Sequence, residues 1–275
     1  MTGPIPEDAC MKTLSLEFRD EVAWVGLNRP DKHNAMNLEM IDELIACARA
    51  LRRRRDLRAV VIHGHGPSFC AGMDLMSIFS SRTRKLYALS QLLRPSAGLF
   101  QRVNLIWRRL PMPVIALVHG HCYGAGMQLA LGADISFVHE QAQLSLMESK
   151  WGMIPDMGAL LTLRGRVAPD LAKELIFTAR VIDARQAQAL GLISHCSADP
   201  QQDVDALLAE LRLRSPDALA AAKKLVDGAL FRRPWRILLG ERLWQLRLIL
   251  GRNHRIAIER NRKSTDRPYA ARSIS

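Results

Sequence analysis

The chain has 275 residues, of which 48% are hydrophobic and 24% charged, and its formal net charge at neutral pH is +12. This length and balance are typical of a folded globular protein with a large core, and they exclude a disordered or fibrous chain. The positive charge predicts attraction to anions such as phosphates. Only 5% of the residues are aromatic, and none are interleaved with the basic segments as single-strand binding requires, so nucleic acid is not an expected partner.

The chain carries no signal for a membrane or an oxidising compartment. No apolar run approaches the ~20 residues that cross a bilayer, and the first residues lack a basic stretch followed by an apolar one. The cysteines are odd in number, scattered and without CxxC spacing, which argues against a disulfide framework and a zinc site. We therefore expect a cytoplasmic protein with no membrane partner. The cysteines are Cys10, Cys47, Cys70, Cys122 and Cys196.

The chain begins with alternating strand and helix patterns. Leu14–Phe18 and Val22–Leu27 are short β-favouring runs on either side of a charged turn, which predicts a hairpin. Asn37 is a favourable N-cap, and the apolar residues after it recur at helical spacing as far as the four arginines 52–55. We interpret these arginines as the solvated C-terminal end of that helix. Ala59–His63 then predicts a buried parallel strand.

The alternation continues and then gives way to helices. Leu99–Leu110 predicts a helix that ends at two prolines, and Val114–Val118 and Ile135–Val138 predict buried strands. Beyond Gly158 the chain becomes mostly helical in pattern. We therefore expect an α/β core over residues 1–200 and a helical region over 201–275. The later helices are predicted near Leu171–Phe177, Ala184–Leu190, Val204–Leu213, Asp217–Ala229, Ile237–Leu250 and Ile256–Arg262.

One of these helices is more apolar than a lone surface helix tolerates. We expect it to pack on the core or on another subunit. Its apolar residues are Trp235, Leu238, Leu239, Trp244, Leu248 and Leu250.

Two turns with small residues follow neighbouring predicted strands. Residues 68–75 (SFCAGMDL) come after the first, and residues 119–128 (HGHCYGAGMQ) come after the second. Glycine lets a backbone approach a ligand closely, and the start of a helix leaves N–H groups free to bind an anion. Two such turns predict a shared oxyanion site. Taken alone, the glycines also fit close helix packing, and Asp74 also fits an ordinary helix N-cap.

Motifs in this order and spacing resemble the crotonase (enoyl-CoA hydratase/isomerase) superfamily. They are NRPDKHNAMN at 28–37, FCAGMDL at 69–75, PVIALVHGHCYGAGMQLAL at 113–131, AQLSLMESKWGMIPDMG at 142–158 and ARVIDARQAQALGLIS at 179–194. The resemblance covers roughly residues 12–265. It implies a spiral of ββα turns forming two stacked sheets, with helices around them. It also implies C-terminal helices at trimer contacts, and hence a homotrimer or homohexamer.

The resemblance also implies residue roles. In the family, two backbone N–H groups form the oxyanion hole, and here they belong to Met73 and Ala125. Hydratases of the family use two glutamates. Gln128 stands at the first position, where an amide cannot exchange a proton at neutral pH, and Glu148 stands at the second. Single-glutamate isomerases use the position of Glu148, so double-bond isomerisation is expected rather than efficient hydration.

Asp156 is a second candidate acid. Dienoyl-CoA isomerases carry an aspartate at this spacing, as well as an acid at the position that Gln128 holds here. Aryl-CoA dehalogenases hold their nucleophilic aspartate in the same place as Asp156, so Asp156 does not choose one reaction. An ordinary helix cap is its alternative reading. For Glu148 a surface salt bridge is the weaker reading, because Leu144 and Leu146 make its neighbourhood apolar, and burial there would raise its pKa.

Coenzyme A would account for the positive charge, because it carries phosphates. The resemblance implies a CoA thioester as substrate, with no permanently bound cofactor. The family binds the adenine end of CoA near two of the motifs. Met76 replaces a lysine that the family often carries there, so the residue that binds the phosphates is undefined. The expected contacts are His33, Ala35, Ala71, Met73, Asp74 and Leu75.

Other readings stay open. His119, His121 and Cys122 look like metal ligands only superficially, since the family binds no metal there, and packing is the expected role. Within enzymes, the alternative is a hydratase or hydrolytic relative in which another acid replaces the missing glutamate. A non-catalytic acyl-CoA-binding protein is an alternative of another class. A nucleic-acid-binding protein would rest on charge alone.

Overall fold

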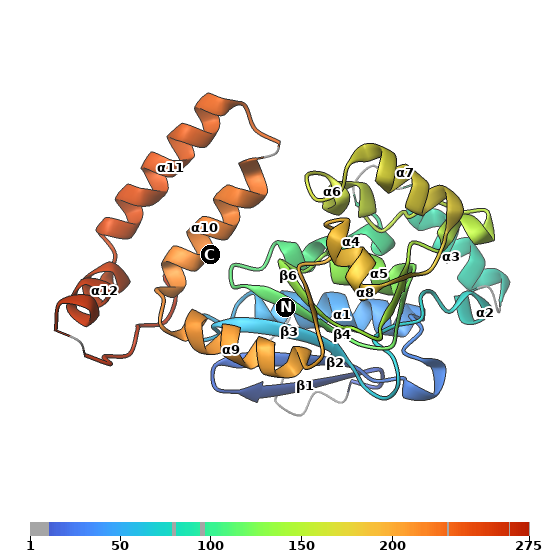
Figure 1. The fold of residues 1–275 in the computed structure, drawn as a ribbon, viewed down its shortest axis with the longest axis horizontal. Coiled ribbons are helices and arrows are strands. Elements are labelled where there is room, and N and C mark those ends of the chain that lie inside the picture. Colours follow the sequence, from blue (N-terminus) through green and yellow to red (C-terminus); the bar gives the residue numbers. More distant parts are fainter. Residues whose placement is uncertain (1–10, 79–80, 94–96, 230, 264, 275) are drawn as a thin grey trace.

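The computed structural model describes residues 11–78, 81–93, 97–229, 231–263 and 265–274, and thus not Cys10. Its strands form a six-stranded sheet in the order β1-β2-β3-β4-β6-β9 and a three-stranded sheet in the order β5-β7-β8 (Figure 1). The strands are β1 (Leu14–Arg19), β2 (Val22–Leu27), β3 (Ala59–Gly64), β4 (Val114–Val118), β5 (His121–Tyr123), β6 (Ile135–His139), β7 (Gln143–Ser145), β8 (Ile182–Asp183) and β9 (His195–Ser197).

The large sheet is antiparallel at one edge and parallel elsewhere. β1 and β2 pair antiparallel with Arg19 opposite Val22, which confirms the predicted hairpin. From β2 through β9 neighbouring strands run parallel. All six residues of β2 are buried, as expected when elements cover both faces of a sheet. Parallel strands end at the same edge, so the segments that follow β3 and β4 emerge close together.

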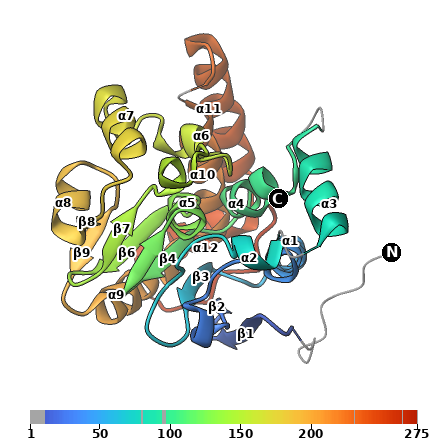
Figure 2. The same cartoon turned by 90° about the vertical axis from the view of Figure 1, so that its right-hand side faces the viewer.

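Helices cover both faces of this sheet. Helices α1 (Leu38–Leu51) and α4 (Leu99–Arg108) lie side by side on one face, and α9 (Pro200–Arg212) lies on the other (Figures 1 and 2). Val204 and Leu208 of α9 pack there in a cluster with strand residues. The predicted N-cap of α1 is confirmed, because Asn37 Oδ1 accepts a hydrogen bond from the Met40 N–H at 2.9 Å.

The helices predicted from Leu171 onwards agree with the sequence pattern to within a few residues, whereas α3 (Arg82–Leu92) and the short elements were missed. β5, for example, falls inside the stretch expected to be a turn followed by a helix, because three residues are too few to show periodicity. The remaining helices are α2 (Leu75–Ile78), α3 (Arg82–Leu92), α5 (Ala125–Leu131), α6 (Ala159–Leu163), α7 (Pro169–Thr178), α8 (Ala184–Ala189), α10 (Pro216–Ala229), α11 (Pro234–Ile249) and α12 (Arg252–Lys263), with short 3-10 helices at Pro30–Lys32 and Glu148–Trp151.

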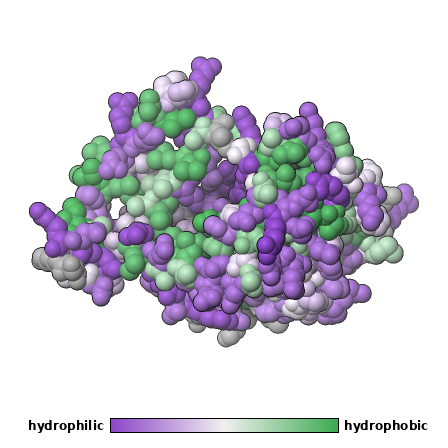
Figure 3. Space-filling view, in the orientation of Figure 1, coloured by the Kyte–Doolittle hydropathy of each residue, from purple (hydrophilic) through white to green (hydrophobic). Residues whose placement is uncertain are grey.

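Helix α11 does not pack on the core within one chain. It has no buried residue and lies against α10, where Trp244 and Leu248 pack on a small cluster. Figure 3 shows apolar side chains over the part of the surface that α10 and α11 form. Leu238 and Leu243, for example, are 57% and 58% exposed. The division of the chain at residue 200 stays a prediction, and α9, which starts there, packs on the sheet.

Two further predictions concern the cell compartment. Among the described residues, no helix combines the length and the apolar character needed to cross a membrane. Cys47, Cys70, Cys122 and Cys196 are free thiols. The cytoplasmic location stays a prediction.

Candidate functional site

The turns that follow β3 and β4 are joined by backbone hydrogen bonds. The Phe69 N–H donates to the His119 carbonyl at 2.8 Å, and the Cys70 N–H donates to the His121 carbonyl at 2.9 Å. The Tyr123 N–H donates back to the Cys70 carbonyl at 3.0 Å. The two turns expected to share one ligand oxygen therefore lie side by side.

Glycines are required where the two turns touch. A Cβ at Gly126 would lie 2.4 Å from the Cys70 carbonyl oxygen, which is too close for any side chain. Gly72 has a φ of +109° and would place a Cβ 3.2 Å from the Tyr123 carbonyl oxygen. Only glycine combines such a backbone with such an approach. The glycines of the two motifs therefore fix the distance between the turns.

The two predicted oxyanion donors lie in these turns. Ala125 is the first residue of α5, so its N–H has no partner within the helix. Within the described loops and turns, neither the Met73 N–H nor the Ala125 N–H donates a hydrogen bond to a backbone carbonyl. The geometry therefore leaves two N–H groups, one from each turn, available to a ligand oxygen.

The segment expected to bind the adenine end lies beside the first turn. The Ala71 N–H donates to the His33 carbonyl at 2.9 Å, and the Met36 N–H donates to the Gly72 carbonyl at 2.8 Å. The carbonyl of Ala35 accepts a hydrogen bond from the Arg29 guanidinium. The structure thus joins the segment that holds His33 and Ala35 to the turn that holds Ala71, and contacts of these residues with CoA stay predictions.

Asp74 has structural partners for both carboxylate oxygens. Oδ2 accepts from Arg29 at 3.1 Å in a largely buried ion pair. Oδ1 accepts from the Ser77 N–H at 3.0 Å, so Asp74 caps the short helix that starts at Leu75. The N-cap reading of Asp74 is therefore confirmed, and contacts of Asp74 and Leu75 with a ligand stay predictions.

Glu148 is the carboxylate that lies against the second turn. It begins a 3-10 helix after β7, and its Oε1 atom lies 3.2 Å from the position that a Cβ on Gly124 would take. Burial raises the pKa of Glu148 above its usual range, and the charge of Asp156 raises it further, while hydrogen bonds oppose the shift. Such a carboxyl can exchange a proton closer to neutral pH than an exposed glutamate can.

The environment of Glu148 supplies one hydrogen bond from a neighbouring amide. Gln128 Nε2 donates to Glu148 Oε1 at 2.6 Å. The other oxygen, Oε2, is buried and has no hydrogen-bond partner among the described residues. Its lone pairs are therefore not committed to another protein group. The structure thus brings Glu148 and Gln128 into direct contact, although 20 residues separate them.

Asp156 is partly buried near the same site. Burial raises the pKa of its carboxyl, and Asp156 also acts electrostatically on Glu148. The N-cap of the next helix, α6, is Gly158, so the alternative reading of Asp156 as a helix cap is wrong. The site therefore holds two acids with raised pKa values beside one amide.

The sequence model of the enoyl-CoA hydratase/isomerase family matches residues 17–237. The chain belongs to this family. Among its relatives, the mitochondrial Delta(3,5)-Delta(2,4)-dienoyl-CoA isomerase of Homo sapiens is 34% identical over 80% of this chain and 70% of its own length. The mitochondrial methylglutaconyl-CoA hydratase of Mus musculus is 33% identical over 75% of this chain and 66% of its own length.

Solved structures confirm the crotonase fold with its two sheets. Pseudomonas aeruginosa AtuE is 30% identical with a TM-score of 0.83, and the match covers 94% of this chain and 98% of that one. A Thermobifida fusca protein crystallised in complex with CoA is 35% identical with a TM-score of 0.77, over 85% of this chain and 91% of that one.

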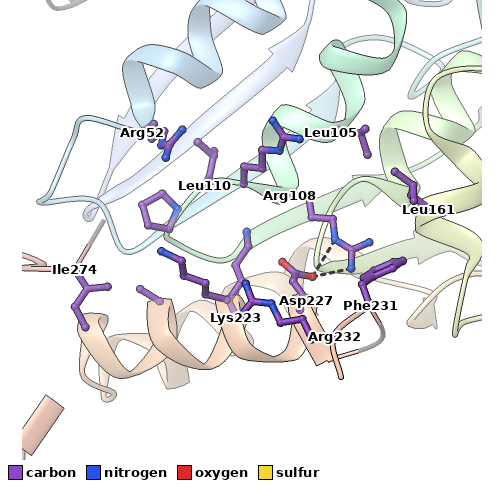
Figure 4. A pocket seen from close by; sticks show the side chains of 15 residues that line it. Arg52, Leu105, Arg108, Leu110, Leu161, Lys223, Asp227, Phe231, Arg232 and Ile274 are labelled. Atoms are coloured by element: carbon purple, nitrogen blue, oxygen red, sulfur yellow. Dashed lines mark hydrogen bonds and ion pairs between the residues drawn. The ribbon is translucent and has the colours of Figure 1, made fainter. Parts of the chain in front are cut away.

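A cationic cavity of about 530 Å³ lies between α4 and α10 of this hydratase/isomerase family member (Figure 4). None of the predicted site residues lines it, so motif geometry and not cavity size locates the candidate site. Asp227 pairs with Arg108 at 2.8 Å, and Asp134 pairs with Lys223 at 2.6 Å. The cations that line the cavity are Arg52, Arg108, Arg109, Lys223, Lys224 and Arg232.

The histidines that resemble metal ligands have structural contacts instead. His119 Nε2 lies 2.8 Å from the Gly66 carbonyl oxygen. The His121 ring stacks on the Tyr123 ring with 5.0 Å between centroids. Cys122 is buried. These contacts agree with the expected packing role.

Two residues that shape the site were missed at the sequence level. Arg29 pairs with Asp74, and Asn104 Nδ2 donates to the Met157 carbonyl at 2.8 Å. Asn104 is fully buried, and it lies between Val103 and Trp107 on the apolar side of α4. A polar residue within an apolar helical stripe is the signal that could have identified it, because buried amides need partners.

Proposed function

We propose that this chain shifts a carbon–carbon double bond in an enoyl-CoA or dienoyl-CoA thioester, with Glu148 moving the proton. The observation that carries the proposal is the 2.6 Å hydrogen bond between Glu148 and the amide of Gln128. Hydration requires one group to activate water and another to deliver a proton. An amide does neither at neutral pH, whereas a proton shift requires only a group that takes and returns one proton.

The reaction conserves all atoms. Glu148 takes a proton from carbon 2, beside the thioester, and the C–H electron pair delocalises onto the thioester oxygen. In a 3-enoyl chain Glu148 returns this proton to carbon 4. In a 3,5-dienoyl chain Asp156, protonated at the start, gives its own proton to carbon 6, and a proton then passes from Glu148 to Asp156 to restore both acids; in each case the double bonds move. The N–H groups of Met73 and Ala125 bind the oxygen while it is negative, and each such donor stabilises the transition state by about 3 kcal/mol.

Asp156 decides which of these shifts is possible. Carbons 2 and 4 are two bonds apart, so one carboxyl serves both. Carbons 2 and 6 are four bonds apart, which is too far for one fixed carboxyl. The partly buried Asp156, close enough to raise the pKa of Glu148, is the second acid available for the longer shift.

The substrate carrier in this proposal is coenzyme A. The Thermobifida fusca neighbour was crystallised with CoA, and a further structure of a protein from that organism has acetoacetyl-CoA. His33, Ala35, Ala71, Met73, Asp74 and Leu75 are the proposed contacts, no permanently bound cofactor is required, and neither nucleic acid nor a membrane is a partner.

A homotrimer or homohexamer also belongs to the proposal. The apolar residues of α11 are exposed in the single chain and provide a surface for a second copy.

The first test is turnover of 3-enoyl-CoA, 3,5-dienoyl-CoA and 2-enoyl-CoA, followed by absorbance and mass spectrometry. We expect double-bond migration without a gain of water mass, and its loss in Glu148→Gln. In Asp156→Asn we expect the 3,5-dienoyl reaction to be lost and the 3-enoyl reaction to be kept. Rapid hydration that does not depend on Glu148 would refute the proposal.

The other readings predict different results. A hydratase would give a water adduct, and a hydrolytic enzyme would give free CoA. The methylglutaconyl-CoA hydratase relatives favour the hydratase reading. A non-catalytic acyl-CoA-binding protein would bind the thioesters tightly without turnover.

A further inference from the structure

Gln128 makes two hydrogen bonds that join separate parts of the site. It is 1% exposed and lies on α5, one turn after Ala125. Its Oε1 accepts from the Met157 N–H at 2.9 Å, and its Nε2 donates to Glu148 Oε1 at 2.6 Å. The orientation of the amide is determined, because a peptide N–H can only donate and therefore faces the amide oxygen.

An amide satisfies both neighbours at once without taking up or losing a proton. The Met157 N–H needs an acceptor, and the ionised Glu148 needs a donor. A carboxylate at position 128 would accept from Met157 but would repel Glu148. An apolar residue would leave the buried Met157 N–H without a partner. In this chain Gln128 therefore makes two hydrogen bonds that neither a carboxylate nor an apolar side chain would make together.

Met157 connects this amide to the second acid. Met157 follows Asp156 directly. Its backbone N–H donates to Gln128, and its backbone carbonyl accepts from Asn104. The two side chains that hold Met157, Asn104 on α4 and Gln128 on α5, are both buried. The backbone that carries Asp156 is thus fixed relative to the carboxylate of Glu148.

We propose that Gln128 is a positioning residue that holds the Glu148 carboxylate and the Asp156 backbone in one fixed arrangement. The inference rests on the proposed proton transfer for its effect on rate. With Oε1 of Glu148 bound to the amide, Oε2 is the oxygen that exchanges the proton. The same hydrogen bond stabilises the ionised form of Glu148, which is the form that takes the proton.

Two variants separate the two hydrogen bonds. Gln128→Glu keeps an acceptor for the Met157 N–H and replaces the neutral donor by a second acid that has to share a proton with Glu148, whereas Gln128→Met removes both partners. For each we expect kcat to fall about 10- to 100-fold with little change in KM, because a charge-assisted hydrogen bond is lost. In a plot of kcat against pH, the decrease on the acid side (the acid limb) should move to higher pH, because the Glu148 anion loses a stabilising partner.

A matched control removes a comparable hydrogen bond far from the site. Ser136 is 2% exposed, and its hydroxyl accepts from the Ser194 N–H at 2.9 Å. Ser136→Ala therefore leaves a peptide N–H without its acceptor, as Gln128→Met does. We expect it to lower the melting temperature without moving the acid limb. If Gln128 had only a structural role, all three variants would lower the melting temperature and none would shift the acid limb of the kcat profile.

An infrared titration tests the inference without turnover. The carboxylic acid band of Glu148 is assigned by its absence in Glu148→Gln. Its titration should move to higher pH in Gln128→Met, which adds no carboxyl group, and stay in place in Ser136→Ala. If the wild-type protein does not isomerise but the band moves as expected, only the proposed reaction fails. A folded Gln128→Met variant with wild-type titration and acid limb would overturn the inference.

Discussion

Replacing Gly124 with alanine should lower both the stability of the protein and its rate, and the loss of rate tests how Glu148 is placed. Gly124 precedes Ala125 and has φ +48° and ψ −114°, a conformation that alanine adopts at a cost of about 1–3 kcal/mol. The added Cβ would lie 3.2 Å from Glu148 Oε1 and 3.7 Å from its carboxyl carbon. These contacts are tight enough to displace the carboxylate by a few tenths of an ångström. A misplacement of about 1 Å costs about 10²-fold in rate, so we expect kcat to fall about five- to tenfold.

Gly152 provides the matched control. It also has a positive φ, +69°, but an added Cβ would meet no atom within 4 Å. Gly152→Ala should therefore lose about 1–2 kcal/mol of stability through backbone strain alone. Thermal melts and kcat measured with a 3-enoyl-CoA would compare the two variants. If folded Gly124→Ala keeps the kcat of Gly152→Ala, the placement of Glu148 against Gly124 does not control the reaction.

Three further predictions concern Glu148 and helix α1. Glu148→Gln should lower kcat about 10²- to 10⁴-fold and yet raise the melting temperature at neutral pH. The pKa of the buried Glu148 carboxyl is higher in the folded than in the unfolded chain, so its ionisation destabilises the folded protein as the pH rises from the unfolded to the folded pKa. If Glu148→Gln and the wild type had equal melting temperatures at neutral pH, this effect of burial would be contradicted. In the wild type, kcat/KM should decrease as the pH is lowered, with an apparent pKa above that of an exposed glutamate. An apparent pKa equal to the ordinary glutamate value would contradict this prediction. Asn37→Ala should cost about 1 kcal/mol of stability by removing the cap of α1, which denaturant unfolding would measure; an unchanged unfolding midpoint would show that the cap is dispensable.

The sequence predicted what depends on local pattern. β2 and β4 agree with their predicted bounds because compact apolar runs identify buried strands. The two turns were found because glycine and small residues follow the strands β3 and β4. The contacts between the turns, in contrast, depend on strand order, which no local pattern contains.

The sequence missed interactions between distant residues. Gln128 was interpreted only as the loss of a glutamate, although it bonds both Glu148 and Met157. These partners lie 20 and 29 residues away, so only the folded chain reveals them. Asp156 was judged ambiguous for the same reason, and the position of the α6 cap at Gly158 removed one of its two readings.

The close contact of Gly72 and Gly126 with the opposite turn bears on how such a protein can be engineered. Because a side chain at Gly126 would collide with a neighbouring carbonyl, mutations there can only disrupt the pair of turns. Their spacing is further tied to β3 and β4, which pair within the core sheet. A library intended to change the accepted acyl chain should therefore keep both turns constant and vary exposed positions beside Glu148, such as Trp151 and Ile154.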